Sequence, residues 1–464
     1  MKENVVPQLR QNYASPSETA NSSVKVGKHL IRYTPSISQQ GGPHQMQIHY
    51  FTKLLGIQGF EVSKVEVKEW FNGQAKVYIE LERIKEGHLC EGCGKEACGY
   101  DHKWQEVQHL MLWQHWVFLR FKRYRVSCQR CGVRTEALDF VGIGGVQVTL
   151  GLSRLASELC KVMTNKAVGI FLGLHKHTVK ELDKQSMSKV QAERSLDGLT
   201  VLGMDEIVVE EGQNYWTMIS APEGPRGPEL LNIVAGRKEK SLKKFWKWFG
   251  PDRAKKITQA VIDMWEPFRN SLRKHCPGIK IIHDKFHVIQ HLLDALNEVR
   301  KSELSKALGR FKKTLSGKKF VLLARQANVR GKAREALNDI LAASPKLLKA
   351  HLLKETLGQL WDYTYKGSML KFWADWKAKL KWSRLKPYHE FVRMVEDHLD
   401  GILAYCDKKV SLGYVERTNL TAKNVIRRAY GYGDKGYMRL KIIQACTPWM
   451  IQFRPWSVTH SSVP

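Results

Sequence analysis

The sequence predicts a multidomain α/β protein, in which a zinc-binding β module and a helix-turn-helix precede an RNase H-like domain interrupted by an all-helical insertion. Three observations support this fold class. Two Cys-x-x-Cys-Gly segments lie at residues 90–94 and 128–132. Short apolar strands alternate with helical segments from residue 199 to 283. A Lys-rich helical stretch then covers about 290–405 before a final acidic motif.

Composition limits the function classes. The chain has 464 residues, and 75 Lys and Arg against 45 Asp and Glu give a net charge of +30. Such a field attracts polyanions, of which nucleic acid is the first candidate. A ribosomal or membrane-surface protein can share this charge, but 43% hydrophobic residues and 14 Trp indicate packed cores. No stretch approaches the roughly 18 apolar residues of a membrane span, and no signal-peptide core is present, so we expect a cytoplasmic protein associated with DNA and no membrane partner.

The first predicted unit is β-rich. Residues 1–45 are rich in Ser, Gln, Asn and Pro and predict a disordered leader, with Met46 as a possible natural start. Alternating apolar residues from Phe60 to Leu81, interrupted at Asn72-Gly73, predict a hairpin with a two-residue turn. This hairpin opens an N-terminal zinc-binding module over 46–140.

The cysteines predict a structural metal site. Nine Cys in a reducing compartment are an improbable disulfide framework, so clustered Cys are first interpreted as metal ligands. Each of the two pairs lies in a tight turn that lets thiolates and backbone amides surround a tetrahedral Zn²⁺. Cys98, His88 and His102 lie nearby and are alternative ligands. We expect the zinc to be held by Cys90, Cys93, Cys128 and Cys131 and to support folding.

Two further segments are candidate DNA-binding elements. Between the Cys pairs, basic and aromatic residues interleave. This pattern is typical of a phosphate-binding surface and equally of an edge strand protected by charges. The basic residues are Arg120, Lys122, Arg123 and Arg125. Residues 146–195 are helical, with an apolar face that includes Leu155, Val162 and Met163 and a break at Thr164. The following segment predicts a helix, a turn at Gly173 and a second helix. This pattern indicates either a helix-turn-helix that contacts DNA, with His177 and Lys180 on its second helix, or plain scaffolding.

The catalytic domain is predicted in two parts, residues 196–290 and 406–455. Strands are expected at Val201–Val209, Tyr215–Ser220, Leu230–Ala235, Ile257–Met264 and Ile279–His283, with a helix around Trp246 and Phe249. Three meandering strands, a crossover helix and two more strands favour an RNase H-type sheet. The helical insertion of 291–405 contains four Trp that either bind DNA or fill a bundle core, namely Trp361, Trp373, Trp376 and Trp382. Residues 456–464 form a tail.

Three carboxylates are candidate catalytic residues. Phosphodiester cleavage requires two divalent cations about 4 Å apart, held by acidic side chains from separate elements. Asp205 lies within the first strand of this domain, and Asp263 follows an apolar run in the fourth. Glu416 precedes a helical segment with polar residues about one turn apart. Because the first and fourth strands are neighbours in an RNase H-like sheet, the two Asp would lie side by side.

These segments resemble a known family. Met204-Asp205-Glu206, Asp263-Met264-Trp265, Asp284-Lys285-Phe286-His287-Val288 and Glu416-Arg417-Thr418-Asn419 are similar, in that order, to signature segments of the ISL-three family of insertion-sequence transposases. The resemblance covers most of residues 46–455 and includes the zinc module, the helix-turn-helix and the insertion. It implies that Asp205, Asp263 and Glu416 form a catalytic triad of the DDE type that holds two Mg²⁺ or Mn²⁺ ions.

Several residues are assigned supporting roles. Asp284 and His287 match an acid-x-x-His element of related families; they are interpreted as supporting the site, with metal ligation by Asp284 or simple helix capping as alternatives. Glu206 would point to the opposite face of its strand from Asp205. Asn419 is expected near the catalytic site, and the basic residues of this region are candidate DNA contacts, namely Arg417, Lys423, Arg427 and Arg428.

The expected function is DNA transposition. The protein would bind the terminal inverted repeats of its own element, cleave at the ends and join the 3′-hydroxyl to target DNA. Pairing of two ends implies at least a homodimer. The alternatives are another RNase H-like nuclease, such as a junction resolvase, and a zinc-containing transcription regulator that binds DNA without cleaving it.

Overall fold

A computed structural model describes residues 50–69, 73–84, 87–142, 146–210, 214–406, 413–429 and 431–453. The predicted leader and tail, 1–45 and 456–464, lie outside the described residues, as does the side chain of Glu416. The architecture is mixed α/β, with a β-rich N-terminal region and a helix-rich C-terminal region. No helix in the described ranges has the length and apolar character that a membrane crossing requires.

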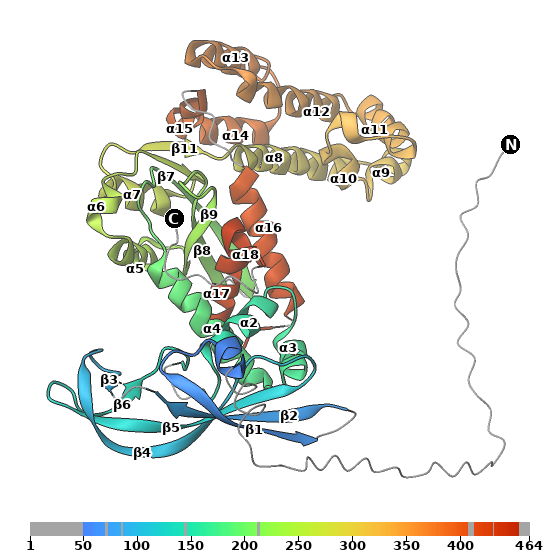
Figure 1. The fold of residues 1–464 in the computed structure, drawn as a ribbon. Coiled ribbons are helices and arrows are strands. Elements are labelled where there is room, and N and C mark those ends of the chain that lie inside the picture. The colour runs from blue at the N-terminus through green and yellow to red at the C-terminus, as the bar shows by residue number, and fades with distance from the viewer. Residues whose placement is uncertain are drawn as a thin grey trace, which may run out of the picture. The chain divides into compact units, whose positions relative to one another are not determined.

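The N-terminal region is one six-stranded sheet with the order β1-β2-β5-β4-β3-β6 (Figure 1). The predicted strand pairing is confirmed, because Val67 pairs with Val77 and Val65 with Ile79, but the last pair is Glu69 with Ala75, so the connection is longer than the predicted two-residue turn. Glu136 lies buried in this sheet and accepts hydrogen bonds from Arg83, His88 and the Tyr124 backbone. The strands are β1 (Phe60–Glu69), β2 (Ala75–Arg83), β3 (His88–Cys90), β4 (Glu96–Gln108), β5 (Trp116–Cys128) and β6 (Gly132–Ala137).

Three helices follow, α2 (Leu150–Leu159), α3 (Asn165–Leu172) and α4 (Lys176–Glu193). Thr164 caps α3 by accepting from the Ala167 backbone, and Gly173 ends α3 in the left-handed conformation at φ 69°. A side chain at Gly173 would collide with Trp116, so this turn requires glycine. The predicted helix, turn at Gly173 and second helix are present. The first helix ends earlier than expected, which leaves Val162 and Met163 exposed in a turn rather than on an apolar face.

The second sheet has the order β11-β10-β7-β8-β9. Strands β7, β8 and β9 form an antiparallel meander, whereas β10 and β11 run parallel to β7. The fourth strand is shorter than the predicted Ile257–Met264. One face packs against α5 and α7, and the other packs against α16 and α17. The elements are β7 (Val201–Glu210), β8 (Asn214–Ala221), β9 (Glu229–Ala235), α5 (Glu239–Phe249), α6 (Pro251–Ala254), β10 (Gln259–Ile262), α7 (Glu266–His275) and β11 (Lys280–His283).

Residues 285–406 are helical, as predicted. Trp373 and Trp376 are buried and stack with ring centroids 5.4 Å apart, and Trp361 is buried beside them in the same core; Trp382, in contrast, is 87% exposed. Three of the four Trp therefore fill a bundle core. The helices are α8 (Lys285–Lys306), α9 (Gly309–Leu315), α10 (Lys319–Leu323), η1 (Gln326–Asn328), α11 (Lys332–Ala343), α12 (Pro345–Leu357), η2 (Gly358–Asp362), α13 (Lys366–Ala378), α14 (Lys386–Asp397), α15 (Leu399–Leu403) and η3 (Ala404–Cys406).

The chain then returns to the second sheet through α16 (Gly413–Arg428), α17 (Lys435–Cys446) and α18 (Pro448–Ile451). A buried polar network joins α17 to the helix-turn-helix. Asp183 of α4 is fully buried and accepts hydrogen bonds from Tyr437 (2.6 Å), Ser157 (3.0 Å) and Lys441 (3.3 Å). Because a buried carboxylate is costly without partners, this network fixes α4 against α17.

Removing one donor from this network should destabilise the protein. Tyr437→Phe deletes the hydroxyl that donates to buried Asp183, and we expect a loss of about 1–3 kcal/mol in unfolding free energy. Urea denaturation followed by circular dichroism measures the change. Tyr365→Phe, at an exposed tyrosine, is the matched control and should leave the unfolding midpoint unchanged. Equal midpoints for the two variants would show that the network contributes nothing.

Candidate active site

Two aspartates meet where β10 ends beside the parallel strand β7. Met204 of β7 pairs with Ile262, the last residue of β10; Asp205 follows Met204 within β7, and Asp263 directly follows the end of β10. The strand register therefore places them side by side, as the sequence predicts. Asp205 is buried, with 5% of its surface exposed, and the Asp263 side chain is 23% exposed. Each carboxylate accepts a hydrogen bond from the backbone amide of the residue that follows it.

Helix α16 packs directly over this part of β7. A side chain at Gly203 would meet Val415 of α16 at 3.1 Å and Ser220 of β8 at 2.6 Å, so glycine permits the close approach of the helix. One turn further along, the Asn419 side-chain amide donates a hydrogen bond to Asp205. Glu416 lies on α16 between Val415 and Asn419; its side chain is outside the described residues.

His287 lies between the two aspartates. Its Nε2 is 3.6 Å from Oδ1 of Asp205, and its Nδ1 is 3.7 Å from Oδ1 of Asp263. Burial lowers the pKa of His287, but the hydrogen bond with Asp205 and the charges of Asp263, Asp205 and Asp284 outweigh it and raise this pKa to about 9. The imidazolium therefore balances negative charge concentrated at this point.

Asp284 begins helix α8. It is buried, and its Oδ1 accepts a hydrogen bond from the Phe286 backbone amide at 2.9 Å. This N-cap fixes the first turn of α8, on which His287 lies. The capping interpretation and the supporting interpretation of Asp284 are therefore compatible, since the cap orients His287.

A pocket of about 450 Å³ opens over Asp205, Asp284, His287 and Asn419, whereas Asp263 is not among its lining residues. Two basic residues of α16 that were predicted to contact DNA, Arg417 and Lys423, line it. Phe286 and Leu420 line it as well, and both are exposed apolar side chains that sequence reasoning did not select. Their only sequence signal is position: Phe286 lies within the Asp-x-x-His segment, and Leu420 follows Asn419. The pocket thus combines carboxylates, cations and an apolar wall.

The other predicted DNA contacts have differing surroundings. Arg120 pairs with Glu106 at 2.8 Å and Glu66 at 3.6 Å, and Arg125 pairs with Asp101. Arg123 donates to Gln105, whereas the Lys122 ammonium lies 5.8 Å from the centre of the Trp104 ring. On α4, Lys180 pairs with Asp434 and Glu181, while His177 is exposed. Arg427 and Arg428 are exposed at the end of α16.

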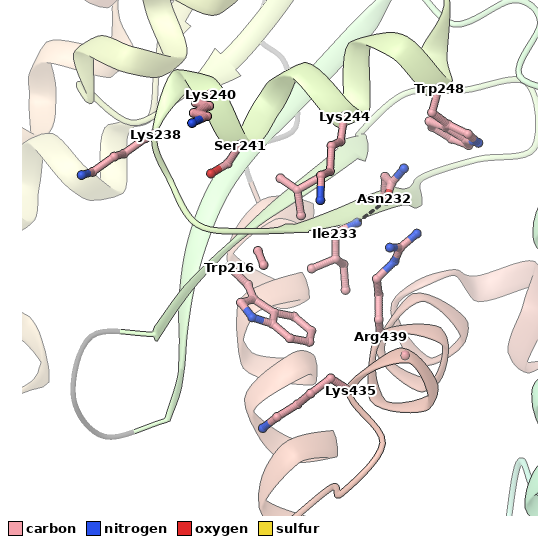
Figure 2. Close-up of a pocket in the computed structure, with 13 residues that line it drawn as sticks. Trp216, Asn232, Ile233, Lys238, Lys240, Ser241, Lys244, Trp248, Lys435 and Arg439 are labelled. Atoms are coloured by element: carbon pink, nitrogen blue, oxygen red, sulfur yellow. Dashed lines mark hydrogen bonds between the residues drawn. The ribbon is translucent and has the colours of Figure 1, made fainter.

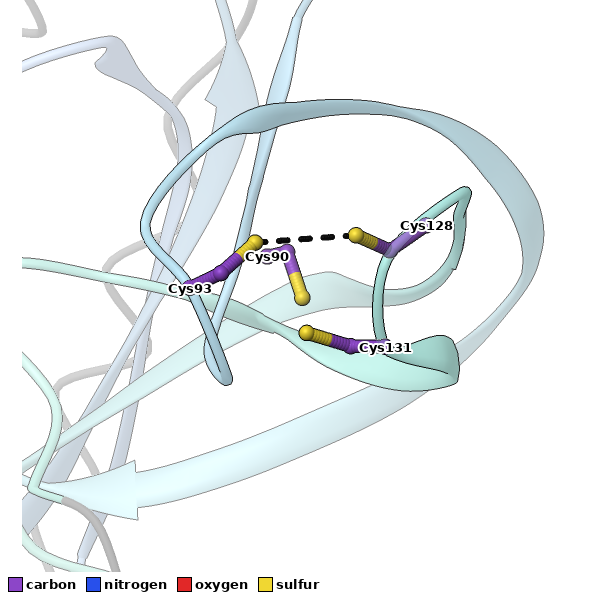
Figure 3. A group of neighbouring side chains, drawn as sticks. All are labelled: Cys90, Cys93, Cys128 and Cys131. Atoms are coloured by element: carbon purple, nitrogen blue, oxygen red, sulfur yellow. Dashed lines mark hydrogen bonds between the residues drawn. The ribbon is translucent and has the colours of Figure 1, made fainter.

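The two cysteine pairs converge into one site (Figure 3). The sulfurs of Cys90, Cys93, Cys128 and Cys131 all lie within 4.8 Å of one another. Gly94 and Gly132 adopt positive φ angles of 68° and 71° in the two turns. Of the alternative ligands, His88 is hydrogen-bonded to Glu136, and Cys98 and His102 are exposed.

The neighbouring thiols of this cluster shift one another's pKa values. Backbone amides of Arg130 and Cys131 lower the pKa of Cys128 to about 7, whereas the neighbouring Cys93 thiol raises that of Cys131 to about 12. Four sulfurs at this spacing fit tetrahedral Zn²⁺, which relieves the repulsion among the thiolates. Because the pairs hold together β3 and the β5–β6 turn, the site is structural.

Zinc content tests the four-cysteine site. We expect Cys131→Ser to lose its bound zinc and to unfold the β3–β6 region, because three thiolates bind the ion less tightly. Elemental analysis of the purified protein measures the zinc. Cys98→Ser, an exposed cysteine in the same region, should retain it. Full zinc in Cys131→Ser would remove Cys131 from the site.

The charge balance at His287 predicts a pH-dependent stability. The pKa of His287 is about 9 in the folded state, above the usual 6.5, so protonated His287 stabilises the fold. This stabilisation is complete below pH 6.5 and is lost as the pH rises to 9. Without added Mg²⁺ or Mn²⁺, the urea midpoint should fall over this window, and the free energy of unfolding should decrease by at most about 3 kcal/mol. His287→Gln should lose less stability across the same window, and a parallel loss in both proteins would contradict the assignment.

Comparison with known proteins finds transposases of insertion sequences. The family model of the ISL-three transposases, described as "Transposase", matches residues 202–442, more than half of the chain. A model of the zinc-finger of the IS204, IS1001, IS1096 and IS1165 transposases matches residues 86–131. The transposase for insertion sequence element IS1001 of Bordetella parapertussis is 29% identical over 399 residues, which are 83% of this chain and 95% of that protein. The transposase for IS1557 of Mycobacterium tuberculosis is 23% identical over 431 residues, covering 83% and 92%. The chain therefore belongs to the ISL-three family of insertion-sequence transposases.

Proposed function

We propose that this protein binds the terminal inverted repeats of an insertion sequence and catalyses metal-dependent cleavage and transfer of the DNA strands. One observation carries the proposal: Asp205 of β7 lies beside Asp263, which directly follows the parallel strand β10, and the helix that carries Glu416 packs over β7. These three carboxylates are the proposed DDE triad.

The proposed fold of the catalytic domain is RNase H-like. Three antiparallel strands followed by two parallel strands, in the order β11-β10-β7-β8-β9, support this assignment. The chain leaves the sheet after β11 and returns as α16, which supports an insertion over about 291–405 within a domain of 196–290 and 406–455. We assign 46–140 to the zinc-binding module and 146–195 to the DNA-binding helix-turn-helix.

The carboxylates fit hard divalent cations. Mg²⁺ and Mn²⁺ prefer oxygen ligands, and Asp205 and Asp263 offer them at one point of the sheet, where the raised pKa of His287 indicates excess negative charge. When bound, two such ions activate the attacking oxygen and stabilise the leaving oxygen of a phosphodiester. Asp205, Asp263 and Glu416 would hold them.

The remaining residues of the pocket position these groups and the DNA. Asn419 orients the Asp205 carboxylate through its hydrogen bond, and Asp284 orients His287 by capping α8. Arg417 and Lys423 would bind phosphates beside the carboxylates. The scissile phosphate would thus contact cationic side chains on one side and carboxylates on the other.

Recognition of the DNA ends is assigned to other parts of the chain. The exposed His177 on the second helix of the helix-turn-helix is a candidate base or phosphate contact, as is Lys122 on the zinc-binding module. Double-stranded DNA of the element and of the target are the proposed partners. Because two ends must be joined, at least a homodimer is expected on DNA.

Neutral isosteres of the triad test the proposal. We expect Asp205→Asn, Asp263→Asn and Glu416→Gln each to abolish strand cleavage with Mg²⁺ or Mn²⁺, because each removes a carboxylate charge. Binding to the terminal repeats should stay within a few fold. Cleavage of a labelled end fragment and electrophoretic mobility shifts measure the two activities.

A control variant tests whether cleavage requires the triad itself or any carboxylate near it. Glu206→Gln changes the residue next to Asp205, but Glu206 pairs with Arg237 at 3.2 Å, so this variant should retain cleavage. Retained cleavage by any triad variant would remove that residue from the site. End binding without cleavage by the unmodified protein would instead favour a DNA-binding regulator, and cleavage without strand transfer another nuclease.

A further inference from the structure

A second groove lies away from the carboxylate pocket, between helices α5 and α17. Its volume is about 690 Å³, and β9, the edge strand of the second sheet, forms its floor. Figure 2 shows Lys240 and Lys244 on α5 along one wall, and Lys435 and Arg439 on α17 along the other. The groove shares no residue with the pocket that contains Asp205.

The charge of this groove is uniformly positive. Five cationic side chains line it, and no acidic residue is among the lining residues that the structure describes: Lys238, Lys240, Lys244, Lys435 and Arg439. Within the described part of the chain, no carboxylate pairs with Lys238, Lys240 or Lys244. The arginines of β5 differ in this respect, because Arg120 and Arg125 are already paired with acidic neighbours. Among the described residues, the positive charge of Lys238, Lys240 and Lys244 is therefore not balanced by a paired carboxylate, and an external anion would balance it.

Two tryptophans lie among these cations. Trp216 of β8 is half-buried in the floor, and Trp248, at the end of α5, is 37% exposed. Figure 2 shows them on opposite sides of Asn232 and Ile233. Aromatic faces beside a row of cations are typical of surfaces that bind unpaired nucleotides, because phosphates pair with the cations while bases stack on the rings. A duplex hides the faces of its bases, so it would use only the cations.

The α4 region contacts one half of the edge strand β9, and the groove lies along the other half. Gln191 of α4 and Arg194, which follows α4, donate hydrogen bonds to the carbonyl groups of Leu230 and Leu231. The following residues, Asn232 to Ala235, line the groove instead. The groove thus begins where the contacts of α4 end.

We propose that this groove binds an unpaired segment of DNA, with phosphates on Lys240, Lys244 and Arg439 and bases on Trp216 and Trp248. The proposal rests on the proposed function, in which strand cleavage and transfer generate unpaired DNA. It adds a second DNA-binding site, separate from the carboxylate pocket.

Binding of the full-length protein to a labelled oligothymidylate, followed by fluorescence polarisation, tests the groove. Lys240→Gln/Lys244→Gln should weaken binding and reduce the slope of log K against log salt by about 1.4, since each phosphate contact contributes about 0.7. Trp248→Ala should weaken binding by about 5- to 100-fold, the effect of losing one stacked base. The matched control, Lys243→Gln/Lys247→Gln, removes two exposed charges from the same helix that do not line the groove, and it should change neither quantity.

The outcomes distinguish this proposal from the proposed function. The proposal would be overturned if the two double variants changed oligothymidylate binding equally, or if Trp248→Ala did not weaken it. If the variants lose affinity only for a duplex probe, the proposal is overturned in favour of a surface that binds phosphates alone. If polyglutamate competes as well as unlabelled oligothymidylate, the proposal is overturned in favour of an acidic protein partner. Cleavage of the terminal repeats by the unmodified protein is measured separately, so its failure would refute the transposase activity and leave the oligothymidylate result intact.

Discussion

The hydrogen bond from Asn419 to Asp205 joins two residues that are 214 positions apart in the sequence. The proposed site depends on this contact, because the helix that carries Glu416 is separated from β7 by the whole helical region. Gly203 makes the contact possible, since any side chain at that position would collide with Val415 and Ser220. The absence of one side chain on β7 therefore allows α16 to bring its polar residues to the aspartates.

The same helices connect the proposed catalytic site to the helices proposed to bind DNA. α16 packs on the second sheet together with α17, and α17 is fixed to α4 of the helix-turn-helix through buried Asp183. Lys180 and Lys184 add ion pairs to Asp434, the cap of α17, and lower the pKa of its carboxyl well below the usual range, with the Lys184 hydrogen bond as the largest cause. The face of α4 that contains these lysines thus packs against protein. A DNA contact by this helix is better placed on the exposed side, where His177 lies.

Local patterns in the sequence predicted much of this structure. The alternation around Val67 and Val77 determined the first hairpin, and the Cys-x-x-Cys-Gly spacing identified the four-cysteine cluster, because both depend on neighbouring residues. Long-range contacts were not predictable in this way. Asp183 and Tyr437 resemble ordinary helical polar residues, and only the packing of α4 on α17 makes them partners. The basic groove was missed for the same reason, since its two walls are nearly 200 residues apart in the sequence.

In the proposed triad, Asp205, Asp263 and Glu416 together form one divalent-cation site. Anomalous diffraction from crystals of the protein soaked with Mn²⁺ would locate the ions. Mn²⁺ peaks are expected between the carboxylates of Asp205 and Asp263, with a Glu416 oxygen among the ligands. Peaks bound by other acidic residues, such as Glu206, with none at the two aspartates, would contradict the proposed triad.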